Sequence, residues 1–338
     1  MLKILDNVLL KDFTTMRVGG LAKHFLVIKS LADLREAFSF VKTRKLPLLV
    51  LGGGSNTLIS DHGFLGLVIK NEIKGIKFVD KNQAEVILEV GAGENLDEVI
   101  ALSVIRKLSG LENLSGIPGT VGGAVVQNAG AYGAEIGNSI VSVSGLNSTN
   151  GKEFTFKTGD CQFTYRSSFF KNNKKYIITT VSFVLNKKAV TNVAYVGLKE
   201  VLANEKELTA EKVRNAVLKI RGEKLPDWHK VGTAGSYFKN PVISQAVLAK
   251  IKSEFPLVPN FPEPNNKVKI PLAWILDNIC HLKGYKEGKV GLYEKQPLIL
   301  VNLGGATFTE IINFANKIKK IVKEKTDIEI VEEVEKII

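Results

Sequence analysis

Two glycine-dense loops are the part of this sequence best suited to bind a phosphate-bearing molecule. The first, residues 52–56 (Gly-Gly-Gly-Ser-Asn), directly follows a short apolar run at residues 47–51. Its backbone amides are unobstructed by side chains, and such amides form a nest for anionic oxygens. The Gly-Lys-Ser/Thr ending of a P-loop is absent, and a tight structural turn explains this triplet equally well when it is taken alone.

The second loop makes a turn-only explanation much harder. Residues 116–123 contain four glycines in eight positions, and the amide-rich segment 127–133 follows closely. The two loops together indicate a long cofactor that contains a diphosphate and lies across two lobes. Residues 91–96 contain the first two glycines of a Rossmann fingerprint, Gly91 and Gly93. A Rossmann site is nevertheless not predicted, because Leu96 occupies the third glycine position, where a small residue is needed for helix–strand packing.

Conventional hydrolytic and metal sites are not indicated. Neither a His-x-x-x-His nor a Gly-x-Ser-x-Gly pattern occurs, and the four histidines lie far apart, at positions 24, 62, 229 and 281. Cys161 and Cys280 allow one disulfide at most and have no zinc-ligand spacing. We therefore expect reduced thiols, no bound metal and a cytoplasmic protein. His281, in an apolar stretch beside Cys280, is expected to pack in the core.

The charge pattern indicates a lysine-solubilised surface rather than a nucleic-acid-binding protein. The 338 residues carry a net charge of +12, but only seven of the 46 basic residues are arginines. Lysine lacks the bidentate fork that reads base edges, and the lysines are spread along the chain. No apolar stretch reaches the roughly 18 residues of a membrane span or forms a signal peptide, so no membrane association is expected.

Three regions differ in their predicted elements. Residues 24–70 form a β-α-β-β pattern, with strands at 24–29, 47–51 and 66–70 and a helix that begins at a capping box of Ser30 and Asp33. Residues 73–190 predict a largely antiparallel lobe. Its strands are expected at 85–90, 140–146 and 176–185, and its one helix at 96–108.

The third region begins near Leu225. Its proline-rich stretch 255–264 predicts a rigid loop. A capping box at Thr307 and Glu310 predicts a helix, and the alternating segment 327–338 predicts a final strand.

The ordered series of motifs resembles the UDP-N-acetylenolpyruvoylglucosamine reductase (UDP-N-acetylmuramate dehydrogenase) family from about Thr14 to Glu333. Glycine loops alone would be a weak signal, whereas this order is specific. The matching segments are residues 52–56, 91–95, 110–119, 127–133, 165–171 and 235–241. Val193-Ala194-Tyr195 and Lys224-Leu225-Pro226-Asp227 look like the longer subtype, which has a tyrosine-bearing substrate loop.

The resemblance implies an α+β chain. Its two-lobed FAD-binding fold is of the para-cresol methylhydroxylase (PCMH)/vanillyl-alcohol oxidase type and is followed by an α/β substrate-binding domain. The FAD-binding domain is expected at 17–188. Its lobes are expected at about 1–72 and 73–225, with 327–338 returning to the second lobe. The C-terminal substrate-binding domain is expected at 226–326.

The resemblance also implies the reaction and its residues. NADPH reduces non-covalent FAD, which then reduces the enolpyruvyl ether of a UDP-sugar in peptidoglycan synthesis. Arg166 and Glu333 would stabilise negative charge on the substrate carboxylate, and Ser236 would donate the proton. A monomer is expected, and its partners are the UDP-sugar and NADPH.

Binding residues are implied in the same way. Cofactor-binding residues are Gly52, Gly53, Gly54, Ser55, Asn56, Gly116, Gly119, Thr120, Gly122, Gly123 and Asn128. Substrate-binding residues are Tyr165, Tyr195, Lys224, Asn240 and Asn278. The tail departs from the family pattern Glu-Pro-Glu-Val-Arg, because this chain has Val331-Glu332-Glu333-Val334-Glu335. Glu335 therefore replaces the arginine expected at the last position.

Two alternatives remain open at this point. The first is a flavin oxidase of the same fold class, which often carries a covalently tethered flavin; neither glycine-rich loop contains a histidine or cysteine to serve as the tether. The second is a non-catalytic binder of UDP-sugars or nucleotides, which would be colourless when purified.

Overall fold

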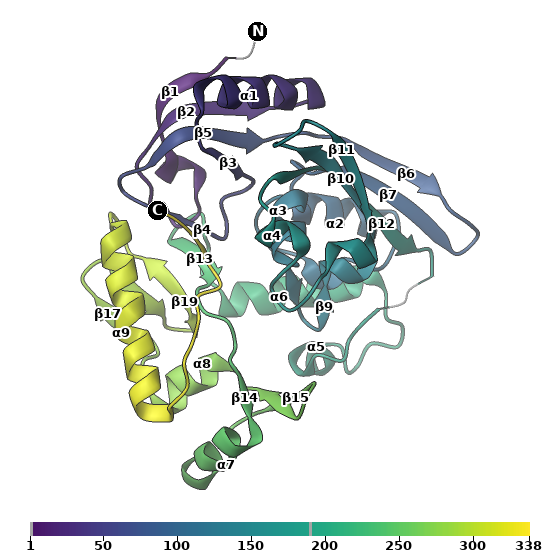
Figure 1. Ribbon diagram of the computed structural model, residues 1–338. Helices are drawn as coiled ribbons and strands as arrows, with labels where there is room; N and C mark the ends of the chain where they lie inside the picture. Colours follow the sequence, from purple (N-terminus) through teal and green to yellow (C-terminus); the bar gives the residue numbers. More distant parts are fainter. Residues whose placement is uncertain (1–2, 189–190) are drawn as a thin grey trace. The chain divides into compact units, whose positions relative to one another are not determined.

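The computed structural model describes residues 3–188 and 191–338, which divide into two compact units (Figure 1). Unit 1 contains residues 3–8, 22–53 and 65–223. Unit 2 contains residues 9–21, 54–64 and 224–338. Both units are therefore assembled from segments that are separated in the sequence. Within the described residues, no helix combines the length and apolarity that crossing a membrane requires.

The first sheet of unit 1 has the strand order β1-β2-β5-β3. Its bounds are β1 Leu5–Leu9, β2 Leu21–Ile28, β5 Phe64–Asn71 and β3 Leu48–Leu51. Strands β3 and β5 are parallel, as expected for strands joined through more than a hairpin. The three predicted strands and the helix between them are confirmed as β2, α1, β3 and β5, but neither β1 nor the short strand between β3 and β5, β4 (Thr57–Ile59), was predicted.

Helix α1 (Leu31–Arg44) covers one side of this sheet (Figure 1). The predicted capping box is confirmed, because the Ser30 side chain accepts from the Asp33 amide and the Asp33 carboxylate accepts from the Ser30 amide. Leu34 and Phe38 then recur at helical spacing and are buried against strand residues such as Leu67.

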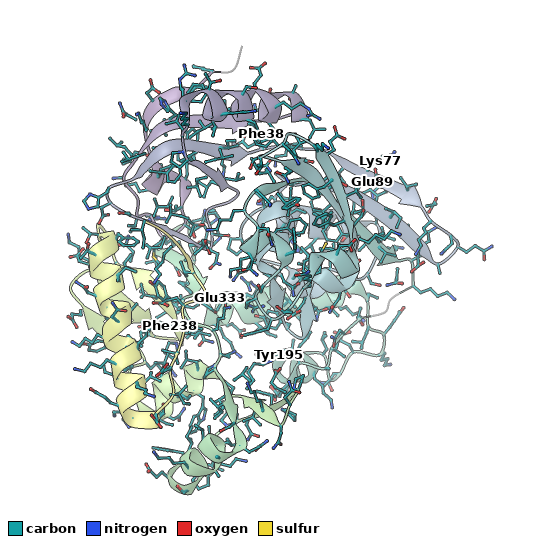
Figure 2. All side chains as sticks on the ribbon, viewed as in Figure 1. Phe38, Lys77, Glu89, Tyr195, Phe238 and Glu333 are labelled. Carbon is teal, nitrogen blue, oxygen red and sulfur yellow. The ribbon has the colours of Figure 1, made fainter. Side chains whose placement is uncertain are left out.

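The second sheet of unit 1 is antiparallel, with the order β11-β10-β12-β7-β6. Its bounds are β11 Glu153–Lys157, β10 Ile140–Asn147, β12 Tyr176–Asn186, β7 Glu85–Gly91 and β6 Ile76–Asp80. The three predicted strands are its three central ones. The two edge strands were not predicted, because exposed edge strands lack the strong apolar pattern of the centre; Lys77 and Glu89 face each other across β6 and β7 (Figure 2).

Short helices complete unit 1. They are α2 Leu96–Ile105, α3 Val121–Gln127, α4 Phe169–Asn172, α5 Val196–Val201 and α6 Ala210–Lys224, with the small hairpin β8 Gly130–Ala131 and β9 Ala134–Glu135 and the 3₁₀ turns Glu112–Leu114, Ile136–Ser139 and Thr158–Cys161. The prediction that α2 reaches residue 108 is wrong. The helix ends at Ile105, and Lys107 has a left-handed φ of 58° that turns the chain away.

Unit 2 is built around the sheet β13-β19-β18-β17 and helix α9. The bounds are β13 Gly232–Ser236, β19 Gln296–Asn302, β18 Val290–Tyr293, β17 Lys286–Glu287 and α9 Phe308–Thr326. The unit also contains the 3₁₀ turn Leu10–Phe13, α8 Leu272–Trp274 and the π-helical turn Ile275–Ile279. The predicted capping box of Thr307 and Glu310 is confirmed. Ile311, Phe314 and Ile318 are buried on one face of α9 and form part of the core.

A smaller sheet, β14-β16-β15, accompanies helix α7 (Gln245–Glu254). The bounds are β14 Val242–Ser244, β16 Lys267–Lys269 and β15 Phe261–Glu263. The prediction of a rigid loop at 255–264 is therefore partly wrong, since the stretch contains β15. Pro262 is tolerated there because β15 is an edge strand, where one side of the backbone needs no ladder partner.

The final strand is shorter than predicted. Only β20 (Glu335–Ile337) forms a ladder, in parallel with β4 (Thr57–Ile59). The amide of Glu333 bonds to the carbonyl of Tyr237, whereas the amide of Glu335 bonds to the carbonyl of Asn56. The tail thus changes its partner within two residues, and this change interrupts the strand expected over 327–338.

Candidate cofactor and substrate sites

The two glycine-rich loops approach each other closely within unit 1. A Cβ atom added to Gly53 would lie 2.5 Å from the Cα of Gly119, and one added to Gly52 would lie 2.5 Å from Oγ1 of Thr120. Side chains at these positions would therefore separate the loops. Segments more than 60 residues apart in the sequence thus form one surface of small residues and backbone amides, which fits the anionic diphosphate of a long cofactor.

Residues 54–56, the end of the first loop, belong to unit 2. Gly54 has a φ of 64°, and a Cβ there would lie 2.0 Å from the carbonyl oxygen of Phe13, so only glycine fits. Ser55 is half-buried. The Asn56 side chain donates to the carbonyl of Glu333 at 3.3 Å. This bond joins the first loop to the tail segment that carries the predicted catalytic glutamate.

Lys70 is a candidate binding residue that the sequence analysis missed. It follows the apolar part of β5, and its Nζ donates to the carbonyl oxygen of Gly52. Burial lowers the pKa of Lys70, with the charges of Glu72 and Lys74 acting in opposite directions. A half-buried ammonium beside the first loop adds positive charge where an anionic group would bind. The only sequence signal was a lysine in an otherwise apolar strand.

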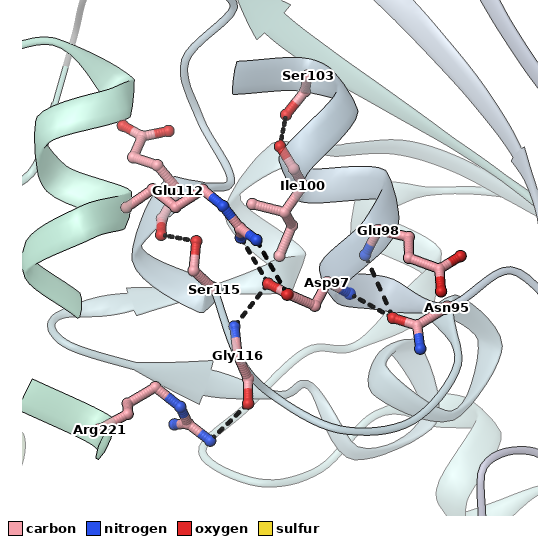
Figure 3. Close-up of polar contacts among 10 residues, drawn as sticks. Asn95, Asp97, Glu98, Ile100, Ser103, Glu112, Ser115, Gly116 and Arg221 are labelled. Carbon is pink, nitrogen blue, oxygen red and sulfur yellow. Dashed lines mark hydrogen bonds and ion pairs between the residues drawn. The ribbon is translucent and has the colours of Figure 1, made fainter. Parts of the chain in front are cut away.

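The second loop is held at Gly116, which has a left-handed φ of 73° (Figure 3). Its amide donates to Oδ1 of Asp97 at 2.7 Å, and its carbonyl accepts from Nη2 of Arg221 at 2.8 Å. Gly119 also has a positive φ, at 117°, and Thr120 caps α3 by accepting from the Gly123 amide. The loop therefore has a defined backbone.

Two residues predicted to contact the cofactor also make well-defined contacts within the chain. Gly122 is buried, and a Cβ there would lie 2.9 Å from the Cβ of Ala92, so its small size permits packing. The Asn128 side chain is completely buried; it donates to Glu135 and Thr164 and accepts from the Gly137 amide. These bonds hold the chain that follows α3. Gly123 is exposed.

Tyr165 and Arg166 lie together, as their adjacent positions predicted. The Arg166 guanidinium lies 5.3 Å from the Tyr165 ring centroid and donates through Nη2 to the carbonyl of Gly130 at 2.8 Å. Lys171 donates to the carbonyl of Arg166 and to Oε1 of Gln127. Two motifs that the sequence separates, 127–133 and 165–171, thus form a single cluster that holds Arg166.

Ser236 and Glu333 come from neighbouring backbone segments of unit 2. Ser236 ends β13, and the next residue, Tyr237, accepts the Glu333 amide at 2.8 Å. Phe238 forms a bridge with Glu332, and Figure 2 shows Phe238 and Glu333 on these adjoining segments. The hydroxyl-bearing and carboxyl-bearing segments are therefore side by side.

The neighbouring carboxylate has a different role from Glu333. Glu332 pairs with Lys319 of α9 at 3.2 Å and with Lys336 at 3.5 Å, and its side chain is only 14% exposed. Burial alone would raise the pKa of Glu332, but hydrogen bonds from its own amide and from Lys319 outweigh burial and hold it below its usual value. Glu332 is thus an ionised anchor of the tail, which favours Glu333 as the functional acid.

The thiols and histidines offer no competing chemistry. Cys161 and Cys280 are buried and free, and burial raises the pKa of each thiol to about 11. The prediction that His281 packs in the core is wrong, because it is exposed with a φ of 56°. Across residues 3–188 and 191–338, no group of three or more His, Cys, Asp or Glu is placed to hold a metal ion.

Comparison with known proteins assigns the chain to a family. Residues 22–156 match a family model described as an FAD binding domain, and residues 227–337 match one described as the C-terminal domain of UDP-N-acetylenolpyruvoylglucosamine reductase. The UDP-N-acetylenolpyruvoylglucosamine reductase of Pseudomonas fluorescens is 36% identical over 332 residues, which is 97% of each chain. The chain belongs to the UDP-N-acetylenolpyruvoylglucosamine reductase family.

Further members of this family agree. The enzyme of that name from Porphyromonas gingivalis is 38% identical over 291 residues, covering 85% of this chain and 86% of its own length. The crystal structure of the Thermus caldophilus UDP-N-acetylenolpyruvylglucosamine reductase superimposes over 100% of both chains with a TM-score of 0.72 at 25% identity. The expected fold is confirmed: an α+β chain in which a PCMH-type FAD-binding domain precedes the C-terminal domain of the reductase family.

The remaining residues that the reductase family implies lie in different local settings. Tyr195 is 45% exposed and packs edge-on against Tyr132, and Lys224 is exposed at the end of α6. Asn278 is exposed and donates to the carbonyl of Trp274. The Asn240 side-chain oxygen accepts a hydrogen bond from the amide of Leu272 at 2.9 Å, and this bond helps to position α8.

Proposed function

We propose that this chain reduces the enolpyruvyl group of UDP-N-acetylglucosamine-enolpyruvate to give UDP-N-acetylmuramate. NADPH is the electron donor, FAD is held non-covalently, and the product enters peptidoglycan synthesis. The observation that carries the proposal is similarity over 97% of the length of a relative that bears the reductase name. A match that includes both the FAD-binding and the C-terminal family models supports the complete reaction rather than cofactor binding alone.

The chemistry explains the residues assigned to the reacting end. Bound FAD would supply the hydride chemistry that connects NADPH to the methylene carbon of the substrate. Negative charge then develops on the adjacent carbon and its carboxylate, so a preplaced cation and a donor lower the barrier. Arg166 supplies the cation through a planar fork suited to a carboxylate, and Glu333 acts as a neutral donor. Ser236 donates the proton, because an enolate is basic enough to take one from a hydroxyl.

The assignment of the cofactor loops rests on their chemistry. Gly52 and Gly53 against Gly119 and Thr120 provide amides without side chains, and Lys70 places an ammonium beside them. We propose that these groups hold the FAD diphosphate. The set of proposed cofactor-binding residues is completed by Gly54, Ser55, Asn56, Gly116, Gly122, Gly123 and Asn128.

The substrate residues are assigned in the same way. We propose that Tyr165 contacts the substrate beside Arg166, and that Tyr195 and Lys224 bind the diphosphate and uridine portions together with Asn240 and Asn278. Exposure of Tyr195 and Lys224 supports this role, since both side chains are accessible to a ligand. These two residues also support the longer subtype with a tyrosine-bearing loop.

We further propose the wider organisation of the protein. The FAD-binding domain is 17–188, with lobes at about 1–72 and 73–225, and the substrate-binding domain is 226–326. The tail 327–338 was expected to return to the second lobe, but it lies in unit 2, where β20 pairs with β4. The chain works as a monomer in the cytoplasm, and its product supports cell shape and division. Light scattering of the purified protein would reveal a dimer if the monomer assignment is wrong.

The absorption spectrum tests the function most directly. The purified protein should be yellow, and heating should release the flavin because no covalent tether is expected. Under anaerobic conditions NADPH should bleach the flavin, and the enolpyruvyl UDP-sugar should restore its colour. A colourless protein that binds no added FAD would favour a simple binder, and fast reoxidation by oxygen without turnover of the UDP-sugar would favour an oxidase.

Two replacements of Glu333 test whether its side chain acts as a hydrogen-bond donor to the substrate. Glu333→Gln should retain part of the activity, because an amide still donates a hydrogen bond, whereas Glu333→Ala should lose far more. The measurement is kcat for reduction of the enolpyruvyl UDP-sugar at saturating NADPH. Glu335→Gln and Glu335→Ala are the matched controls; if they show this pattern and the Glu333 variants do not, the register of the tail is misassigned.

A further inference from the structure

Both backbone polar groups of Gly116, its N–H and its C=O, form hydrogen bonds with side chains of unit 1 (Figure 3). Its amide donates to Asp97 in the first turn of α2, and its carbonyl accepts from Arg221 of α6. A residue at a φ of 73° that is held through both its N–H and its C=O has little freedom to rotate. The orientation of the second glycine-rich loop therefore depends on these two contacts.

Asp97 is itself held by a second arginine of α6. Arg214 donates through Nη1 to Oδ1 at 2.5 Å and through Nη2 to Oδ2 at 3.0 Å, which is the bidentate geometry of a strong arginine–carboxylate pair. The Arg214 side chain is only 14% exposed and that of Asp97 is 33% exposed, so solvent screens the pair weakly. Oδ1 of Asp97 is shared between Arg214 and the Gly116 amide.

The charge state of Asp97 favours this arrangement. Burial alone would raise the pKa of Asp97, but hydrogen bonds from Arg214 and the Gly116 amide, with the charge of Arg221, hold it below its usual value. The carboxylate is therefore ionised at neutral pH and accepts from both groups at once.

The two arginines lie on one face of one helix. Arg214 and Arg221 are seven residues apart in α6, which is two helical turns. One reaches the loop directly and the other reaches it through Asp97. Helix α6 also packs its apolar face, including Val213, Val217 and Ile220, against α5, so it is a fixed support.

We propose that Arg214 is a positioning residue for cofactor binding, which acts through Asp97 to set the backbone of the Gly116 loop. The proposal rests on the proposed function, because it assigns the FAD diphosphate to this loop. Arg214 touches Asp97 rather than the loop, so its effect is indirect. Arg214 affects how well the loop amides are oriented to donate hydrogen bonds to the diphosphate. The rate of hydride transfer after FAD is bound should not depend on it.

The test compares FAD affinity with stability. FAD is removed from the full chain, and its return is titrated by quenching of flavin fluorescence; thermal unfolding of the apoprotein is recorded in parallel. Arg214→Gln and Asp97→Asn should each weaken FAD binding about 10- to 100-fold, the usual scale for a charge-assisted hydrogen bond. At saturating FAD, the kcat of both variants should return to within about two-fold of the wild-type value.

Arg35→Gln is the matched control. Arg35 bonds to the Glu153 carboxylate and to the Gly151 carbonyl elsewhere in unit 1, so its loss also removes an ion pair and a backbone contact. It should leave FAD affinity unchanged. Arg214→Lys keeps the charge without the fork and should bind FAD with intermediate affinity, which guards against a Gln variant that does not fold.

A double-mutant cycle with Arg214→Gln and Asp97→Asn tests whether Arg214 acts on the loop through Asp97. If Arg214 acts through Asp97, the double variant should bind FAD no more weakly than either single variant. Unchanged FAD affinity in Arg214→Gln and Arg214→Lys would overturn the positioning role, and fully additive losses would overturn the route through Asp97. A wild-type apoprotein that binds no FAD would instead overturn the proposed function itself.

Discussion

Ser236→Ala should leave reduction of the bound flavin by NADPH unchanged and slow reduction of the enolpyruvyl UDP-sugar by about 10²–10⁴-fold, the usual contribution of a positioned general acid. The two halves of the reaction separate because only the second needs a proton from this hydroxyl. Anaerobic stopped-flow absorbance measures both rates in one protein. The affinity for the UDP-sugar should change little, since one hydroxyl is a small part of its contacts.

Two further measurements identify the proton donor. In deuterated water the wild-type product should carry deuterium at the carbon next to the carboxylate. Ser253→Ala is the matched control, because Ser253 is an exposed serine of unit 2 that bonds only locally, to the carbonyl of Lys250. If Ser236→Ala turns over at the wild-type rate, another group delivers the proton.

Gly53→Ala should give a folded protein that contains little or no FAD. The added Cβ would lie 2.5 Å from the Cα of Gly119 and 3.3 Å from the Thr120 amide, so the two loops must move apart. Because the neighbours are backbone atoms rather than a flexible side chain, they cannot easily yield. We expect FAD content, measured by the ratio of flavin to protein absorbance, to fall at least about ten-fold.

Gly159→Ala controls for the general cost of replacing a glycine in unit 1. A Cβ at Gly159 would meet no atom within 4 Å. That variant should keep wild-type FAD content, and circular dichroism should show both variants folded. Full FAD occupancy in Gly53→Ala would remove this loop from the cofactor site.

The sequence predicted the elements that local chemistry determines. Capping boxes at Ser30 and Thr307 marked helices because their partners lie three residues away. Edge strands such as β11 were not predicted, because an exposed strand has a weak apolar pattern and its pairing depends on a distant neighbour. The start of β20 was misjudged for the same reason: its ladder depends on Thr57–Ile59.

The same limit applies to the candidate site. The glycine loops were recognised from composition, but their contact at Gly53 and Gly119 is a property of the folded chain. Asp97 and Arg214 are 117 positions apart, and no spacing rule connects them. Such residues contact the loop backbone rather than a ligand and carry no motif of their own, so only the structure reveals them.

The pairing of β20 with β4 has a consequence for synthesis in the cell. Unit 2 combines residues 9–21 and 54–64 with residues 224–338, so its early segments leave the ribosome long before their partners. Most of unit 1 is complete by residue 223 and can fold first, since domains generally fold as units during translation. We expect the early strand β4 to remain unpaired in the nascent chain until β20 emerges. That interval exposes apolar residues such as Leu58 and Ile59, which are buried in the finished protein, and makes them natural binding sites for a chaperone.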